Sequence, residues 1–342
     1  MSCFVKSASR LFAVPDRIAV SRKRVSGLFA AAALSLAASQ AQAVGFQRIS
    51  LPMDMNGPAL QGAAWYPCDA PEVEITVGRS VIAGTPGCPM PAGPMTLVVM
   101  SHGSGGSFLG HHDTARALAE AGFVVAALNH TGDNALDRSR QGYLSIFSTR
   151  PREIRRLIDY MTGAWPGRAQ LRSDAVGFFG FSRGGYTGLV LAGAAPDFSQ
   201  GLSFCESQPG LPMCRDIAAG KAPVQPYPKD VRVKALVIAD PLNAFAPSAL
   251  AGVAASVQLW ASEQGGDGVT PASVEALRQG LPAGTDFRRV AGAGHFAFVA
   301  PCSQAQADAL PSLCSDGPGF DRAAFHRDFN AGVVAFMRQA LR

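Results

Sequence analysis

The chain has 342 residues, of which 48% are apolar, and a formal net charge of +5 at neutral pH. Six of the 30 basic residues and one of the 25 acidic residues lie in the first 43 positions, which leaves 24 of each in the remainder. A remainder with no net charge and no Lys/Arg cluster lacks the electrostatic footprint of a nucleic-acid binder. We therefore expect small-molecule chemistry, in a chain large enough for one sizeable core.

Residues 1–43 have the pattern of an export signal. A basic stretch at 22–24 precedes an apolar run at 28–38, and the segment ends in Ala41-Gln42-Ala43. This pattern predicts a signal peptide that is cleaved after Ala43. The apolar run of about eleven residues is short of the ~20 that a membrane-spanning helix needs. We expect an exported protein, periplasmic or secreted, with no permanent membrane span.

Residues 44–342 show the element order of a single α/β domain, with a mostly parallel central sheet flanked by helices. Antiparallel strands are expected first, near the N-terminus and at one edge of the sheet, over 46–67 and 73–82. Short apolar runs then alternate with helical patterns, which is typical of a parallel sheet. The expected strands are 95–100, 123–128, 175–181, 233–239, 257–261 and 287–290. The expected helices are 113–121, 152–161, 185–191, 272–281 and 322–341.

Two segments, 131–149 and 196–230, interrupt this alternation and are too long for ordinary connections in a compact domain. The second is rich in Gly and Pro and is expected to be a surface segment that is held by a disulfide and passes over the active site. Six cysteines follow the signal, and an even count in an exported chain favours disulfides. Fifteen connectivities are possible, and we favour the three local pairs because each would staple one loop. These pairs are Cys68 with Cys88, Cys205 with Cys214, and Cys302 with Cys314.

The pentapeptide at 180–184, Gly-Phe-Ser-Arg-Gly, follows an expected strand and precedes an expected helix. A nucleophile elbow needs this context, because its serine occupies a strained turn that tolerates only small flanking residues. Ser182 is therefore the candidate nucleophile. A serine hydroxyl is a poor nucleophile at neutral pH, so the chain must also supply a base and a group that orients the base.

His295 is the candidate base, because it lies in a glycine-rich loop after the last expected strand and follows Ser182 in the chain order of such triads. Two aspartates compete to orient it, and each ends a parallel strand, at the edge where these sheets gather functional groups. We favour Asp267, in a glycine-rich loop, from strand order and loop mobility. The alternative is Asp240, at the end of the preceding strand.

The oxyanion of an acyl-transfer intermediate needs preorganised N–H donors. The backbone N–H of Arg183, directly after the nucleophile, is one candidate. The second is expected in the loop at 101–106, Ser-His-Gly-Ser-Gly-Gly, at Ser104 or alternatively at Gly103. The histidines at 111–112 and 130 match no familiar metal spacing, so we expect neither a metal nor a cofactor.

At this point the chain resembles the α/β-hydrolase superfamily, in the branch labelled dienelactone-hydrolase-like and related to platelet-activating-factor acetylhydrolases. The resemblance covers residues 95–302. It rests on Ser101-His102-Gly103, on Gly-Phe-Ser-Arg-Gly-Gly at 180–185, on Asp267-Gly-Val-Thr-Pro, and on Gly-His-Phe-Ala-Phe followed by Pro301-Cys302. It implies an α/β-hydrolase fold and hydrolysis of a small-molecule ester through an acyl-enzyme, without a cofactor.

The chain also departs from that branch. Dienelactone hydrolases use a cysteine nucleophile, whereas this chain has Ser182 at that position. The acetylhydrolases place their acid where Asp240 lies, and bacterial esterases place it where Asp267 lies. The expected function is a serine carboxylesterase. An acyltransferase or amidase on the same triad is the alternative, and a non-catalytic binding protein of this fold is the least favoured one.

Overall fold

The computed structural model describes residues 43–199, 202, 205–206, 208–223 and 225–342. The expected signal peptide lies outside the described residues except for Ala43, which begins the first strand. The described residues form one compact unit. Its strands are β1 Ala43–Leu51, β2 Leu60–Cys68, β3 Val73–Val77, β4 Ser80–Pro86, β5 Met95–Ser101, β6 Val124–Leu128, β7 Leu171–Phe181, β8 Val233–Ala239, β9 Ser256–Ser262 and β10 Asp286–Val290.

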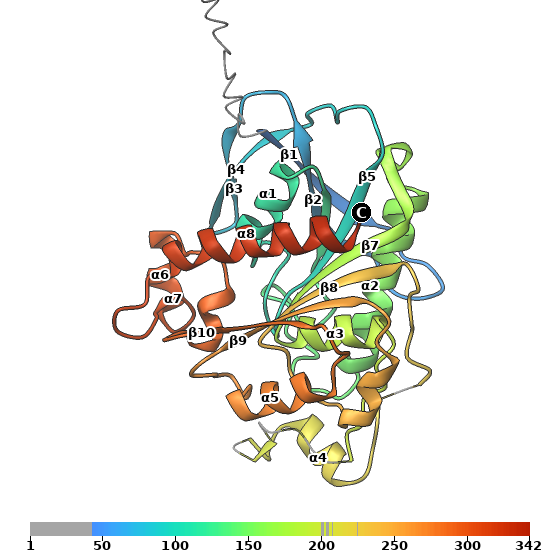
Figure 1. Cartoon of the computed structure of the whole chain (residues 1–342), viewed down its shortest axis with the longest axis vertical. Helices are drawn as coiled ribbons and strands as arrows, with labels where there is room; N and C mark the ends of the chain where they lie inside the picture. Colours follow the sequence, from blue (N-terminus) through green and yellow to red (C-terminus); the bar gives the residue numbers. More distant parts are fainter. Residues whose placement is uncertain (1–42, 200–201, 203–204, 207, 224) are drawn as a thin grey trace, which may run out of the picture. The chain divides into compact units, whose positions relative to one another are not determined.

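The five predicted helices are present, mainly between the parallel strands, and short helices that were not predicted join them (Figure 1). The helices are α1 His112–Glu120, α2 Ile146–Gly163, α3 Arg183–Leu191, α4 Pro212–Ala218, α5 Pro271–Gly280, α6 Gln304–Ala309, α7 Pro311–Cys314 and α8 Arg322–Ala340. Short 3₁₀ segments lie at Arg168–Gln170, Pro247–Gly252 and His295–Phe298.

All ten strands form one mixed sheet, in the order β10-β9-β8-β7-β5-β6-β2-β1-β4-β3. The six strands from β5 to β10 pair in parallel, and β2 joins them antiparallel to β6. The N-terminal strands therefore occupy one edge, as expected, although β1 and β4 pair in parallel there. The predicted fold class, a mostly parallel sheet with flanking helices and added edge strands, is confirmed.

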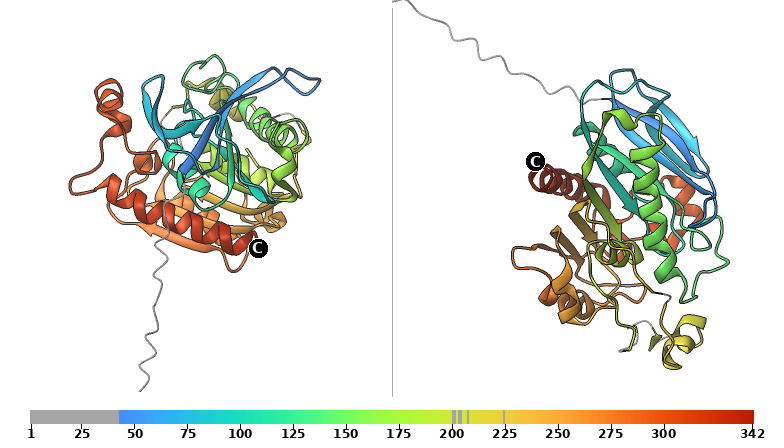
Figure 2. Two further views of the ribbon diagram at one scale, coloured as in Figure 1. Left: turned by 90° about the horizontal axis from the view of Figure 1, so that it is seen from above. Right: turned by 90° about the vertical axis from the view of Figure 1, so that its right-hand side faces the viewer.

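Helices cover both faces of the sheet. Alternate residues of the central strands point to opposite sides, so each strand contributes to two core clusters. On β5, Leu97 and Val99 belong to the core cluster that includes residues of α2, α3 and α5. Val98 and Met100 belong to the second cluster, with residues of α1 and α8. Figure 2 shows α2 and α8 on opposite sides of the sheet. Strands buried on both faces read as continuous apolar runs, which is why they could be found in the sequence.

Helix α2 begins at Ile146, six residues before the predicted start at Arg152. The predicted start was wrong: the helix continues N-terminally through Pro151, a residue that is uncommon inside helices. A proline has no N–H to donate to the carbonyl four residues earlier. Here that carbonyl, of Phe147, accepts instead from the hydroxyl of Tyr186 at 3.2 Å. The first interruption therefore ends at about residue 145.

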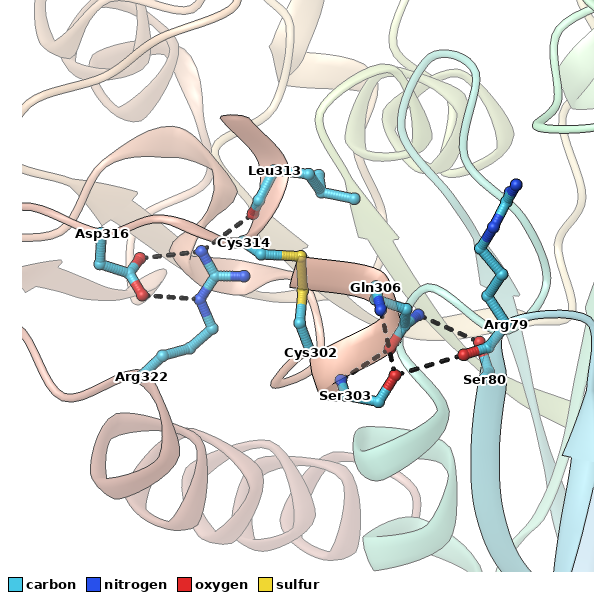
Figure 3. Close-up of a disulfide and its surroundings, with 9 residues drawn as sticks. All are labelled: Arg79, Ser80, Cys302, Ser303, Gln306, Leu313, Cys314, Asp316 and Arg322. Carbon is cyan, nitrogen blue, oxygen red and sulfur yellow. Dashed lines mark hydrogen bonds and ion pairs between the residues drawn. A yellow bond between two sulfur atoms is a disulfide. The ribbon is translucent and has the colours of Figure 1, made fainter. Parts of the chain in front are cut away.

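The three local disulfides form as expected, at Cys68–Cys88, Cys205–Cys214 and Cys302–Cys314. Figure 3 shows the third, which joins the segment before α6 to the end of α7. Nearby, the Nε2 of Gln306 donates to Ser80 Oγ on β4 at 3.1 Å. This region is therefore fixed to the antiparallel edge of the sheet as well as by its disulfide.

Candidate active site

The turn from β7 to α3 places Ser182 in a backbone conformation that non-glycine residues rarely adopt, with φ 55° and ψ −120°. The residues two positions before and after it must be glycine, because the turn is tightly packed. A Cβ on Gly184 would lie 1.9 Å from the carbonyl oxygen of Ser101, and one on Gly180 would lie 2.4 Å from that of Gly184. The strained serine and the crowded glycines have the form that a nucleophile elbow requires.

His295 and Asp240 form a buried pair beside this turn. The Nδ1–H of His295 donates to Oδ2 of Asp240 at 3.0 Å, and each side chain is only 1% exposed. The imidazole packs against the ring of Phe181, with 4.6 Å between centroids, so it lies next to the residue that precedes Ser182. Its Nε2 is buried and has no hydrogen-bond partner among the described residues. An unpartnered ring nitrogen therefore lies on an imidazole that packs against the residue before Ser182.

The Asp240 carboxylate is fixed by further donors. The backbone N–H of Ser262 donates to Oδ1 at 2.7 Å, and the Ser262 hydroxyl donates to Oδ2. The backbone of Asp240 has φ 41°, and its N–H donates to the carbonyl of Trp260. The carboxylate that orients His295 is therefore held by the neighbouring strand β9. Ser262 was not singled out from the sequence, where no motif marks it.

Asp267, the acid favoured from the sequence, is not the residue that bonds to His295 in the structure. The glycine loop that carries it approaches the histidine through its backbone: the N–H of His295 donates to the carbonyl of Gly265 at 2.8 Å. The Asp267 side chain is exposed and lines a cavity instead. Asp240 directly follows β8, whereas Asp267 lies five residues beyond the end of β9, and the strand order alone does not tell which carboxylate faces the imidazole.

The loop after β5 lies against Ser182. A Cβ on Gly103 would be 3.3 Å from the Cβ of Ser182. The backbone N–H groups of Gly103 and Ser104 make no hydrogen bond with any other described residue. His102 braces this loop: its Nδ1–H donates to the Gly103 carbonyl at 2.6 Å, and its Nε2 accepts from the N–H of His130. Burial is the main cause that lowers the pKa of His102, so the ring stays neutral.

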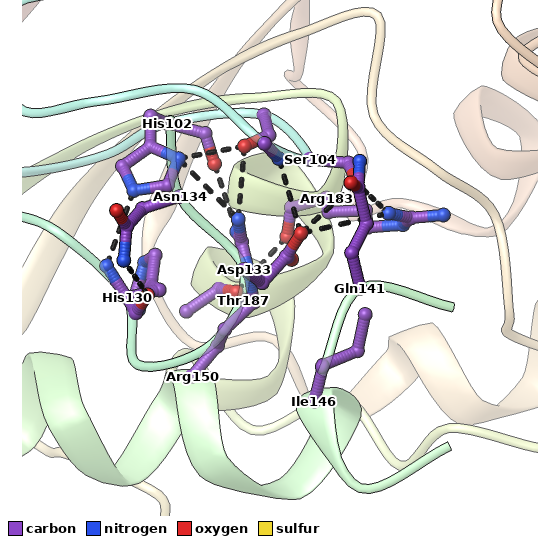
Figure 4. A network of polar contacts seen from close by, with 12 residues as sticks. His102, Ser104, His130, Asp133, Asn134, Gln141, Ile146, Arg150, Arg183 and Thr187 are labelled. Atoms are coloured by element: carbon purple, nitrogen blue, oxygen red, sulfur yellow. Dashed lines mark hydrogen bonds and ion pairs between the residues drawn. The ribbon is translucent and has the colours of Figure 1, made fainter. Parts of the chain in front are cut away.

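His130 is fully buried and does not line the cavity described below. It lies between the hydroxyl of Ser101, at 2.8 Å, and the carboxyl of Glu153, at 2.7 Å. Burial lowers the pKa of His130 and raises the pKa of Glu153 to about 7. His130 is thus part of a buried polar network under the loop, much of which is drawn in Figure 4.

A cavity of about 260 Å³ opens beside Ser104 and Arg183. The residues that line it come from both interrupting segments and from the core of the site: Ser104, Gln141, Gly142, Arg183, Gln208, Leu211 and Asp267. Pockets for drug-sized ligands are usually larger and mainly apolar. Leu211 is the one aliphatic side chain in this lining, so the cavity suits a small group with polar atoms.

Neither a metal site nor a membrane span emerges from the part of the chain that is described. Within it, no three His, Cys, Asp or Glu side chains are grouped so that they could hold a metal ion. None of its helices has the length and apolar character needed to cross a bilayer. The residues gathered at the site are those of acid–base and nucleophilic chemistry.

No family model and no curated protein sequence matches the chain. Many solved structures share its fold, and one of them is the ferulic acid esterase from Streptomyces cinnamoneus. That match has a TM-score of 0.60 at 16% sequence identity and covers 88% of this chain and 90% of that one. At this level of identity the likeness concerns the fold, a mostly parallel α/β sheet with flanking helices.

Proposed function

We propose that the protein is an exported serine carboxylesterase in which Ser182 is the nucleophile, His295 the general base and Asp240 the acid that orients it. The observation that carries the proposal is the buried His295–Asp240 hydrogen bond, on an imidazole that packs against Phe181, the residue before the strained Ser182, and whose Nε2 has no partner among the described residues. An unpaired buried nitrogen costs free energy, so it calls for an explanation, and proton transfer from Ser182 supplies one.

In the proposed mechanism Ser182 Oγ attacks the ester carbonyl while its proton passes to Nε2 of His295. The carbonyl oxygen becomes an oxyanion, which accepts from the N–H of Arg183 and from that of Ser104 or Gly103. Collapse breaks the bond to the alkoxy group, which leaves as an alcohol with the proton from His295. Water then repeats the sequence on the acyl-enzyme, releases the carboxylic acid and restores Ser182.

Two finer parts of the proposal rest on other features. Three disulfides fit an oxidising compartment, which supports the export predicted from residues 1–43. The resemblance to the dienelactone-hydrolase-like and acetylhydrolase branch supports ester chemistry with a serine in place of the cysteine. In that branch the acetylhydrolases place their acid at the position of Asp240, which agrees with the acid proposed here.

The decisive test is Ser182→Ala, assayed with p-nitrophenyl acetate and with methyl ferulate, since an esterase of the same fold acts on ferulic acid esters. We expect hydrolysis to fall to the uncatalysed background with the unfolding temperature preserved. Ser312→Ala, at an exposed serine of α7, is the control and should retain full activity. Activity of Ser182→Ala equal to that of the wild type would refute the nucleophile.

The choice of acid is tested by Asp240→Asn and Asp267→Asn, measured separately. An amide cannot hold the imidazole in the required tautomer, so Asp240→Asn should lower kcat by about 10⁴-fold. Asp267→Asn should change KM by only a few-fold, because this side chain lines the cavity. The opposite order of the two effects would return the role to Asp267.

The alternatives differ in what reaches the acyl-enzyme. An acyltransferase would pass the acyl group to an added alcohol in preference to water, and an amidase would cleave anilides as readily as esters. A non-catalytic binding protein would leave Ser182 unmodified by a fluorophosphonate probe. We expect probe labelling, with water as the main acceptor.

A further inference from the structure

The loop after β5 has two candidate oxyanion donors, Gly103 N–H and Ser104 N–H. The carbonyls of their peptide groups accept hydrogen bonds from a buried arginine. The Nη1 of Arg150 donates to the carbonyl of His102 at 2.8 Å, and its Nη2 donates to that of Gly103 at 2.9 Å. Arg150 lies in α2, and its side chain is 1% exposed. One buried guanidinium thus binds two successive carbonyls of the loop (Figure 4).

Peptide geometry turns these contacts into an orientation of the donors. A trans peptide group is planar, and its N–H points opposite to its C=O. When Arg150 holds the His102 carbonyl, the N–H of Gly103 must point away from the guanidinium. Its bond to the Gly103 carbonyl directs the N–H of Ser104 in the same way. Both donors are therefore turned out of the network, on a loop that lies against Ser182.

Asp133 fixes the guanidinium in turn. Its Oδ2 accepts from Nε of Arg150 at 2.9 Å, and its Oδ1 accepts from the Ser104 hydroxyl and from the N–H of Gly105, both at 3.0 Å. Burial by itself raises the pKa of Asp133, but the charges of Arg150 and Arg183, together with the N–H of Gly105, hold that pKa below its ordinary value. The loop is bound at four successive residues, 102–105, by one buried ion pair.

We infer that Arg150, held by Asp133, is a positioning residue that orients the oxyanion donors of the loop. The inference rests on the proposed function, because it assigns Arg150 a role in that reaction without contact to the substrate. Preorganised donors need no rearrangement when charge develops in the transition state, so their orientation affects kcat more than substrate binding.

The chain offers a closely matched control on the same helix. Arg156 is also buried, donates to the carbonyls of Pro52 and Pro58 at 3.0 and 2.9 Å, and pairs with Asp54 at 3.1 Å. It therefore binds two carbonyls and one carboxylate, as Arg150 does, but in the connection between β1 and β2. A role in stability alone would make the two arginines equivalent in an assay of catalysis.

The experiment compares Arg150→Met with Arg156→Met in the mature chain. Kinetics are measured with p-nitrophenyl acetate and with the corresponding thionoester, whose sulfur accepts hydrogen bonds weakly. Arg150→Met should lower kcat by about 100-fold, the effect of losing one oxyanion donor, with little change in KM. Its preference for the ester over the thionoester should also fall. Arg156→Met should keep both the wild-type kcat and this preference, whatever stability it loses.

Arg150→Lys provides a second variant if Arg150→Met does not fold. One ammonium keeps the charge but lacks the planar fork that reaches both carbonyls and the carboxylate, so kcat should fall by about tenfold. A folded Arg150 variant with unchanged kcat and unchanged thionoester preference would overturn the inference alone. A wild-type protein without Ser182-dependent hydrolysis would instead overturn the proposed function.

Discussion

Two segments border the cavity, and they are attached to the rest of the molecule in different ways. Residues 131–145, the first segment, bond to the site through buried side chains. Asp133 accepts from the Ser104 hydroxyl in the loop after β5, and Asn134 Nδ2 donates to the carbonyl of His130 at 2.7 Å. Residues 196–230, the second segment, carry their own disulfide and meet the first through the N–H of Met213 and the carbonyl of Gly142.

The difference separates two tasks. The first segment is bonded to the groups that we propose to carry out the reaction, so changes in it should affect kcat. The second contributes Gln208 and Leu211 to the cavity wall and has no such bonds to the loop among its described residues. Changes in it should affect which esters bind, and so KM. The predictions below test this separation, from the largest expected effect to the smallest.

Asp133→Asn should have the largest effect. The amide keeps the size of the side chain but leaves Arg150 and the nearby Arg183 without their buried counter-charge. We expect kcat to fall by about 100-fold, as for a lost oxyanion donor. Breaking a buried ion pair should also cost roughly 3 kcal/mol of unfolding free energy, measured with denaturant. A loss of stability with kcat unchanged would show that the first segment is only structural.

Glu153→Gln tests the lower end of the same network, where the N–H of Thr131 donates to the carboxyl group of Glu153. The pKa of Glu153 is raised from 4.5 to about 7, mainly by burial. Between these values the folded state binds more protons than the unfolded one, so this carboxyl lowers stability as the pH rises. The shift corresponds to roughly 3 kcal/mol. Glutamine mimics the protonated acid and should remove this loss.

The measurement is denaturant unfolding of both proteins between about pH 4 and about pH 8. His102 and His130 act in the opposite direction, because burial lowers their pKa values and stability rises with pH towards 6.5. They are present in both proteins, so the difference between the proteins isolates Glu153. The variant should gain on the wild type as the pH rises. A constant difference would mean that Glu153 has no raised pKa.

What could be predicted from the sequence depends on whether a feature is set by residues close in the chain or by the fold. The elbow at Ser182 and the strands around it follow from local patterns: glycines at crowded positions and continuous apolar runs. Such signals depend on neighbours along the chain. The choice between Asp240 and Asp267 depends instead on how the chain turns after two adjacent strands, and Ser262 completes that arrangement from a third position.

Arg150 could not have been found from the sequence. It is one of four arginines between positions 150 and 156, and no spacing distinguishes the one that faces the loop from the others. The predicted helix, 152–161, began after Arg150, and Pro151 gives no sign that the helix continues before it, because prolines are uncommon inside helices. The carbonyl left free by Pro151 bonds to Tyr186, from α3, more than thirty residues later. Only the fold brings these residues together.

The next effect concerns the disulfide of the second segment. Replacing Cys205 and Cys214 together with serine opens a short loop, which should cost about 2 kcal/mol. KM for p-nitrophenyl acetate should change several-fold with kcat preserved. The control replaces Cys302 and Cys314, whose loop is of similar length but lies away from the cavity lining. It should lose comparable stability without a change in KM. A fall in kcat confined to the first variant would contradict the separation.

The smallest effect is expected for Gln208→Ala. This side chain is exposed and lines the cavity, so its contribution is at most one hydrogen bond to the bound ester. A bond of that kind contributes about 1 kcal/mol, which corresponds to a rise in KM of roughly fivefold at constant kcat. The rise should appear with esters that place a hydroxyl or amide in the cavity and not with p-nitrophenyl acetate. Gln279→Ala, at an exposed glutamine of α5, should change neither. If Gln208→Ala instead lowered kcat for every ester, the second segment would belong to the reacting site as the first does, and the two could no longer be distinguished by function.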